Sequence, residues 1–204
     1  MEILLSRNKE IIREYIKEKS KIGFIPTASE LDKDRWYIEK DIEDLNKMKF
    51  NIVYIDVSKE SKEEIVKKFN DIDAIFVAGG NSFYLLQQLK IKDVLQDLIE
   101  FANNKIYVGT SAGACIVCPS IDYLQKLDNK LQAPLLDNCN AMNLVDFYVL
   151  PHYKSKEKYT KIADEIEKNY NNYKFVKISN EQAIIVDEVN NYSKIIKKFY
   201  WKMW

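Results

Sequence analysis

The sequence predicts an α/β protein with a three-layer, doubly wound and mostly parallel sheet whose two faces are covered by helices. Short apolar runs alternate with longer segments of helical periodicity along most of the chain. Two glycine-containing breaks, at 79–80 and 109–113, directly follow two of these runs. No repeat, low-complexity stretch or linker divides the 204 residues. We therefore expect one domain over 1–204.

The first half of the chain is expected to alternate strands and helices. The apolar run at 22–25 stops at Pro26, and Ser61 with Glu64 forms a capping-box pattern that opens a helix. Apolar residues among many charges over 32–48 predict a helix with one buried face. The expected strands are 22–25, 52–55, 74–78 and 105–108, and the expected helices are 32–48, 61–69, 83–89 and 94–102.

The second half is less regular. Residues 119–146 contain two prolines and are expected to form a long excursion around the site. A strand over 147–150 that ends at Pro151 precedes His152, and a surface helix follows over 156–168. We also expect a closing pair of strands at 175–178 and 183–186 and a third strand near 195–196. The aromatic residues near the C-terminus are expected to pack on the sheet or, alternatively, to cover a homodimer interface (Phe199, Tyr200, Trp201 and Trp204).

Composition excludes several classes of function. The 31 basic and 31 acidic residues balance, which argues against nucleic acid or a membrane surface as a partner. No apolar run reaches the roughly 18 residues of a membrane helix, and the N-terminus lacks the order of a signal peptide. Three cysteines do not suggest a disulfide framework in a chain of this length. We expect a cytoplasmic protein with reduced thiols.

Ser111 is the candidate nucleophile. It stands between Gly109 and Gly113 directly after the apolar run at 105–108, which is the strand-to-helix context of a nucleophile elbow. The glycines allow a sharp bend and leave the hydroxyl accessible. The alternative is a tight turn in which the serine only caps the helix.

His152, the single histidine of the chain, is the candidate base. Imidazole suits this role because its unperturbed pKa lies near neutrality. The alternative is a histidine with an ordinary polar role. Sequence spacing does not choose the acid that would orient the ring; the candidates are Asp122, Asp128, Asp137, Asp146, Glu181 and Asp187.

The Gly79-Gly80 pair is the candidate oxyanion loop. An acyl-transfer intermediate needs two backbone N–H groups aimed at its negative charge. Ala112 would supply one and Gly80 or its neighbours the other, and we expect Gly79 and Asn81 to contact the substrate. The alternative is a plain turn with Asn81 or Ser82 as a helix cap.

Cys115 and Cys118 form a C-x-x-C pattern, which is compatible with a redox site or half a metal site. No second cysteine pair exists, and there is one histidine. We interpret the two residues as buried structural thiols and expect neither metal nor organic cofactor.

Several motifs together resemble the peptidase E and cyanophycinase family of serine peptidases, whose fold is similar to that of class I glutamine amidotransferases and to flavodoxin. The matching segments are 24–26, 78–83, 109–114, 119–121, 151–153 and 179–183. The resemblance implies a serine nucleophile at Ser111, a base at His152 and an oxyanion hole at Gly80 and Ala112. It also implies an order of serine, histidine and then acid along the chain.

The chain departs from the family pattern in two ways. The position of the third triad member, a carboxylate in the family, matches Asn180, with Glu181 beside it. Asn180, Glu181 or Asp128 could orient the imidazole. Specialists for aspartyl dipeptides in the family use an arginine near the base, whereas here only lysines lie near His152 in sequence (Lys154, Lys156, Lys158 and Lys161).

The leading hypothesis is a serine-type, dipeptidase-like enzyme that hydrolyses amide bonds of small peptides through an acyl-enzyme. The alternative, motivated by Asn180, is a binding protein of the same fold with weak or no catalysis. A third hypothesis is a thiol-dependent protein that uses Cys115 and Cys118.

Overall fold

The computed structural model describes residues 2–6, 11–187 and 192–197. Its centre is a seven-stranded sheet in the order β3-β2-β4-β5-β1-β8-β9. The first five strands in this order run parallel, and β8 and β9 continue the sheet antiparallel. The strands are β1 (Glu2–Ser6), β2 (Lys21–Ile25), β3 (Asn51–Tyr54), β4 (Ala74–Val77), β5 (Ile106–Gly109), β8 (Gln182–Asp187) and β9 (Tyr192–Lys197).

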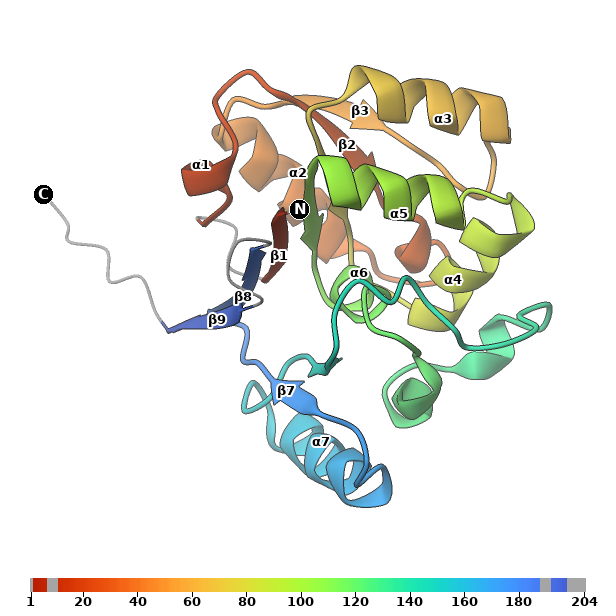
Figure 1. Ribbon diagram of the computed structural model, residues 1–204, viewed down its shortest axis with the longest axis vertical. Coiled ribbons are helices and arrows are strands. Elements are labelled where there is room, and N and C mark those ends of the chain that lie inside the picture. The colour runs from red at the N-terminus through yellow and green to blue at the C-terminus, as the bar shows by residue number, and fades with distance from the viewer. Residues whose placement is uncertain (1, 7–10, 188–191, 198–204) are drawn as a thin grey trace, which may run out of the picture.

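Helices cover both faces of this sheet (Figure 1). Alternate side chains of β4 lie on opposite faces of the sheet. Ile75 and Val77 belong to the larger apolar core, and Ala74 and Phe76 belong to the smaller one. The larger core lies under α3 (Lys62–Asp71), α4 (Ser82–Ile91), α5 (Leu95–Asn104) and α6 (Ala112–Cys115), and the smaller one under α1 (Ile12–Tyr15) and α2 (Trp36–Lys47). The expected three-layer α/β class is confirmed.

A second, two-stranded sheet lies beside the main one and carries α7 (Glu157–Asn169) (Figure 1). Its strands, β6 (Tyr148–Leu150) and β7 (Phe175–Lys177), pair in parallel with Leu150 opposite Lys177. The expected closing pair of strands at 175–178 and 183–186 is therefore wrong. The strands belong to different sheets, because β8 pairs with β1 instead, with Leu5 opposite Ile184.

Most other elements occur where the sequence predicts them, with shifted ends. The capping box at Ser61 and Glu64 is present and opens α3. Residues 119–146 form an excursion with two short 3-10 helices, η3 (Asp122–Lys126) and η4 (Lys130–Gln132). Strand β1 was not predicted. The aromatic residues at 199–204, for which we expected packing on the sheet or a homodimer interface, lie outside the described residues. Within the described part of the chain, no helix is both long and apolar enough to cross a bilayer.

The site is positioned by two neighbouring strands. β4 and β5 pair in parallel with Val77 opposite Gly109, so the segments that follow them start side by side. The Thr110 N–H donates to the Val77 carbonyl at 3.0 Å and joins the two segments just beyond the sheet. Both glycine breaks of the sequence therefore lie at one carboxyl edge, where sites of doubly wound sheets form.

Candidate active site

Ser111 lies at a strained bend between β5 and α6. Its backbone has φ 49° and ψ −108°, a conformation that non-glycine residues rarely adopt. The bend is possible because Gly113 packs directly on β4: a Cβ at this position would lie 2.2 Å from the Val77 carbonyl oxygen. The buried Tyr107 hydroxyl donates to the Gly113 carbonyl at 2.7 Å. This is the geometry of a nucleophile elbow, whose strain is held by the surrounding core.

Three side chains form a continuous line at this bend. Ser111 Oγ lies 2.9 Å from His152 Nε2, and His152 Nδ1 lies 2.7 Å from Asn180 Oδ1. An amide oxygen only accepts, so Nδ1 carries the proton in this contact. Nε2 then has a free lone pair for the serine hydroxyl. The Asn180 contact therefore selects the tautomer in which His152 can act as a base.

The small sheet supplies both His152 and Asn180. His152 follows β6 and has a left-handed backbone with φ 62°. Tyr153 donates its N–H to the Ile178 carbonyl at 2.9 Å, and the Ser155 hydroxyl donates to the His152 carbonyl at 2.6 Å. Asn180 follows β7, two residues beyond Ile178. The parallel pairing of β6 with β7 thus sets the distance between the ring and the amide.

Two other candidates for orienting the imidazole lie elsewhere. Asp128 is half-buried, and its carboxylate accepts the N–H of Ser82 at 2.9 Å. Glu181 is exposed and is absent from the cavity wall, and its own N–H donates to Ser179 Oγ at 3.3 Å. Asn180 is the candidate that reaches His152 Nδ1.

The loop after β4 faces Ser111. A Cβ at Gly79 would lie 3.7 Å from Ser111 Oγ, so the absent side chain leaves room above the hydroxyl. Gly80 has φ 137°, and a Cβ there would lie 2.2 Å from the Ala28 carbonyl oxygen, which requires glycine. Within the described chain no acceptor is bonded to the N–H of Gly80 or Ala112. Both are the predicted oxyanion donors.

Both the amide oxygen and the amide nitrogen of Asn81 form hydrogen bonds that hold the loop after β4 in place. Its Oδ1 accepts the N–H groups of Phe83 and Tyr84 and caps α4. Its Nδ2 donates to the Asn129 carbonyl and to Gln132 Oε1. The helix-cap alternative is therefore realised at Asn81, although the residue also lines the cavity.

A cavity of about 510 Å³ opens above the line of Ser111, His152 and Asn180. Its wall combines the carboxyl edge of the sheet, the start of α2, the 127–132 segment and the segment around His152. Among the described charged residues that line it are Asp32, Asp41, Asp128 and Lys156. A volume of this size accommodates a small-molecule ligand.

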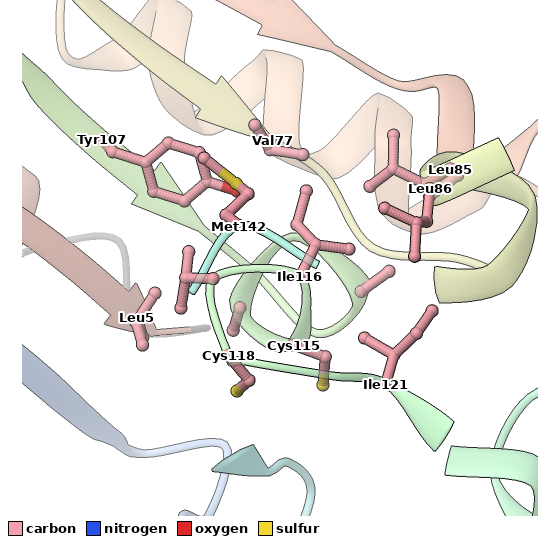
Figure 2. Close-up of a cluster of buried hydrophobic side chains, with 14 of the residues drawn as sticks. Leu5, Val77, Leu85, Leu86, Tyr107, Cys115, Ile116, Cys118, Ile121 and Met142 are labelled. Atoms are coloured by element: carbon pink, nitrogen blue, oxygen red, sulfur yellow. The ribbon is translucent and has the colours of Figure 1, made fainter. Parts of the chain in front are cut away.

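The two cysteines of the C-x-x-C pattern are buried among apolar side chains, including Leu5, Ile116 and Ile121 (Figure 2). Burial raises the pKa of the Cys115 thiol well above its usual value and that of Cys118 to about 11. Cys118 Sγ accepts the Val149 N–H at 3.3 Å. Protonated, buried thiols support a structural role.

A strained elbow serine that contacts an imidazole, next to two free backbone N–H groups, is typical of serine hydrolases built on an α/β sheet. The chain belongs to peptidase family S51, whose family model matches residues 2–192.

Relatives and solved structures agree with this assignment. An uncharacterized peptidase of Listeria innocua is 39% identical over 85% of this chain and 84% of its own length. A peptidase E of Nostoc is 30% identical over 74% of this chain and 64% of its own length. The crystal structure of a candidate peptidase E from Listeria monocytogenes superposes with a TM-score of 0.86 at 33% identity, over 97% of this chain and 98% of that one. The protein is therefore a peptidase of the peptidase E type.

Proposed function

We propose that this peptidase hydrolyses amide bonds of small peptides, in the manner of a dipeptidase, with Ser111 as nucleophile and His152 as base. The observation that carries the proposal is the continuous contact from Ser111 Oγ through the His152 ring to Asn180 Oδ1, at 2.9 and 2.7 Å. The cavity of about 510 Å³ above Ser111 supports a small substrate.

The proposed reaction begins when His152 Nε2 accepts the hydroxyl proton and Ser111 Oγ attacks the scissile carbonyl carbon. The oxygen of that carbonyl becomes an oxyanion and accepts hydrogen bonds from the N–H groups of Gly80 and Ala112. The tetrahedral species collapses as His152 gives the proton to the leaving amine, which leaves an ester on Ser111. Water that has lost a proton to His152 then hydrolyses the ester, and the serine recovers its proton.

The test compares Ser111→Ala with the wild type on a panel of dipeptides. We expect turnover to fall by more than about 10⁴-fold, because both covalent steps need the hydroxyl. Ser61→Ala is the matched control: it removes the hydroxyl that caps α3, outside the cavity wall, and activity is retained where the variant is folded. Wild-type rates in a folded Ser111→Ala variant would refute the proposal.

The amide at position 180 favours a second candidate function, a peptide-binding protein with weak or no catalysis. An amide holds the imidazole but does not add a negative charge to stabilise the imidazolium. A fluorophosphonate probe separates the two candidates. Labelling of the wild type at Ser111, lost in Ser111→Ala, supports the enzyme, whereas no labelling across pH 6–9 supports the binding protein.

A further inference from the structure

The oxyanion loop after β4 rests on a segment that follows β2. The Ala28 carbonyl accepts the Asn81 N–H at 2.7 Å, and a Cβ at Gly80 would lie 2.2 Å from the same carbonyl oxygen. Ala28 belongs to a short 3-10 helix, η2 (Thr27–Ser29). Because the two backbones touch, the direction of the Gly80 N–H, one of the predicted oxyanion donors, depends on where η2 is held.

Glu30 directly follows η2 and links it to two neighbouring elements. Its Oε2 accepts the Tyr84 hydroxyl at 3.0 Å, and Tyr84 lies in the first turn of α4. The Glu30 carboxyl also lies within hydrogen-bonding reach of the Asp56 carboxyl and the Ser58 side chain, both in the loop after β3. One side chain thus connects η2, the loop after β3 and the start of α4.

The contact between Glu30 and Asp56 requires a proton. Glu30 Oε1 is buried, yet no donor in the described part of the chain reaches it in bonding geometry. Two ionised carboxylates are both acceptors and repel each other, whereas one shared proton turns the contact into a hydrogen bond. Burial, together with the contact to Asp56, raises the pKa of Glu30. Burial also opposes ionisation of Asp56, but hydrogen bonds from Lys59, Ser58 and Glu30 outweigh it and lower the pKa of Asp56 to about 2. Glu30 therefore holds the proton of the pair.

The other charged groups described around this pair are engaged in contacts of their own. Lys59 Nζ lies 2.5 Å from Asp56 Oδ2, but the lysine is 75% exposed, so water screens much of its charge. Glu60 accepts the Asp56 N–H at 2.8 Å and pairs with Lys68 of α3. Arg35 donates to a serine hydroxyl of η2. A second ionisation in the pair therefore places two negative charges side by side where the three elements meet.

Resting on the proposed function, we propose that Glu30, as a carboxylic acid, is a positioning residue for the oxyanion loop. It donates its proton to Asp56 and accepts the Tyr84 hydroxyl, and it thereby holds Ala28 against Gly80. Loss of the proton separates the two carboxylates, loosens η2 and misaligns the Gly80 N–H. Because the oxyanion forms only after attack on the carbonyl, the effect falls on kcat rather than on KM.

The test compares Glu30→Gln with the wild type, because the glutamine amide donates to Asp56 and accepts the Tyr84 hydroxyl at every pH. The measurement is kcat and KM from pH 5 to pH 9 on the dipeptide of the panel that the wild type hydrolyses fastest. We expect the kcat of Glu30→Gln relative to the wild type to rise with pH by about tenfold, part of the roughly 10²–10³-fold lost with a whole oxyanion donor. The ratio of the KM values stays constant. A kcat ratio that is constant or falls with pH overturns the inference.

Further variants locate the effect, each at pH values where circular dichroism shows a folded protein. Asp56→Asn removes the negative neighbour, and its amide donates to the ionised Glu30, so its kcat relative to the wild type also rises with pH. This variant keeps the test valid if Glu30→Gln does not fold, and a constant ratio in it overturns the inference. Glu63→Gln is the matched control, because Glu63 is exposed in the first turn of α3. Its kcat ratio is constant with pH, and a rise equal to that of Glu30→Gln contradicts a role specific to Glu30.

Fluorophosphonate labelling of the wild type separates this inference from the proposed function. Labelling at Ser111 together with a constant kcat ratio for Glu30→Gln leaves the proposed function standing and overturns the role of Glu30. No labelling and no hydrolysis of any dipeptide overturns both.

Discussion

Asn180→Asp tests the role of the amide that contacts the base. The variant replaces the Oδ1 that lies 2.7 Å from His152 Nδ1 with a carboxylate oxygen at the same position. Because the amide already selects the productive tautomer, the substitution changes mainly the charge next to the ring. The imidazolium that forms in the transition state then has a negative neighbour, and we expect catalysis to become faster.

The magnitude follows from the geometry. Charge centres about 4 Å apart interact by roughly 4 kcal/mol at an effective dielectric constant of about 20. His152 and Asn180 are both half-buried, so solvent screens the pair, and we retain about a third of that value. The remaining ~1.4 kcal/mol corresponds to roughly a tenfold increase in kcat.

The assay is kcat and kcat/KM against pH on a dipeptide that the wild type hydrolyses. Beside the rate increase, the acidic limb of the profile moves to higher pH, a change that a purely structural role of residue 180 would not produce. Asn180→Ala lowers the rate, and Glu181→Ala, which alters the exposed neighbour, is the matched control. A folded Asn180→Asp variant with a lower rate, or a larger effect at Glu181, would refute the reasoning.

Three further predictions follow from the elbow and the cavity. Gly113→Ala destabilises the protein by about 2–3 kcal/mol in chemical denaturation, because the added Cβ would lie 2.2 Å from the Val77 carbonyl oxygen, and an unchanged midpoint would contradict the tight packing. Iodoacetamide at pH 7 leaves Cys115 and Cys118 of the native protein unmodified by mass spectrometry, since burial raises the pKa of both thiols. Asp128→Asn raises the melting temperature at pH 7, and the gain shrinks as the pH falls. The sign follows from the pKa of Asp128, which desolvation raises: the folded state holds the proton at a pH where the unfolded state has lost it, so wild-type stability decreases as pH rises through the folded pKa. A rise in the melting temperature of Asp128→Asn that becomes larger as the pH falls would contradict this prediction.

Local signals were enough to predict the elbow and most elements of the main sheet. The bend at Ser111 and the capping box at Ser61 each depend on a few neighbouring residues whose chemistry permits little else. β1 was missed because the run Ile3 to Leu5 is buried throughout and lacks the alternation that marks a half-buried strand. A short buried run at the start of a chain has no flanking turn signal to define it.

The identity of the residue that orients the imidazole could not be derived in this way. Asn180 and Glu181 are adjacent, so their side chains point in different directions, and the one that reaches the base depends on how β6 and β7 pair. The register that places Leu150 opposite Lys177 decides this. Sequence spacing predicted instead that 175–178 would pair with 183–186, and in that arrangement nothing would distinguish the two candidates.

Nucleophile and base come from separate sheets, so their distance depends on how the small sheet packs against α6 and the segment from Ile116 to Tyr123 that follows it. The contact is made of buried polar groups at Val149 in β6: its carbonyl accepts the Tyr123 hydroxyl at 2.7 Å, and its N–H donates to Cys118 Sγ. Such groups tolerate little displacement, because a shifted strand would leave them unpaired inside the protein. The C-x-x-C segment thus contributes to the site by fixing β6, and thereby His152, relative to Ser111, rather than by thiol chemistry.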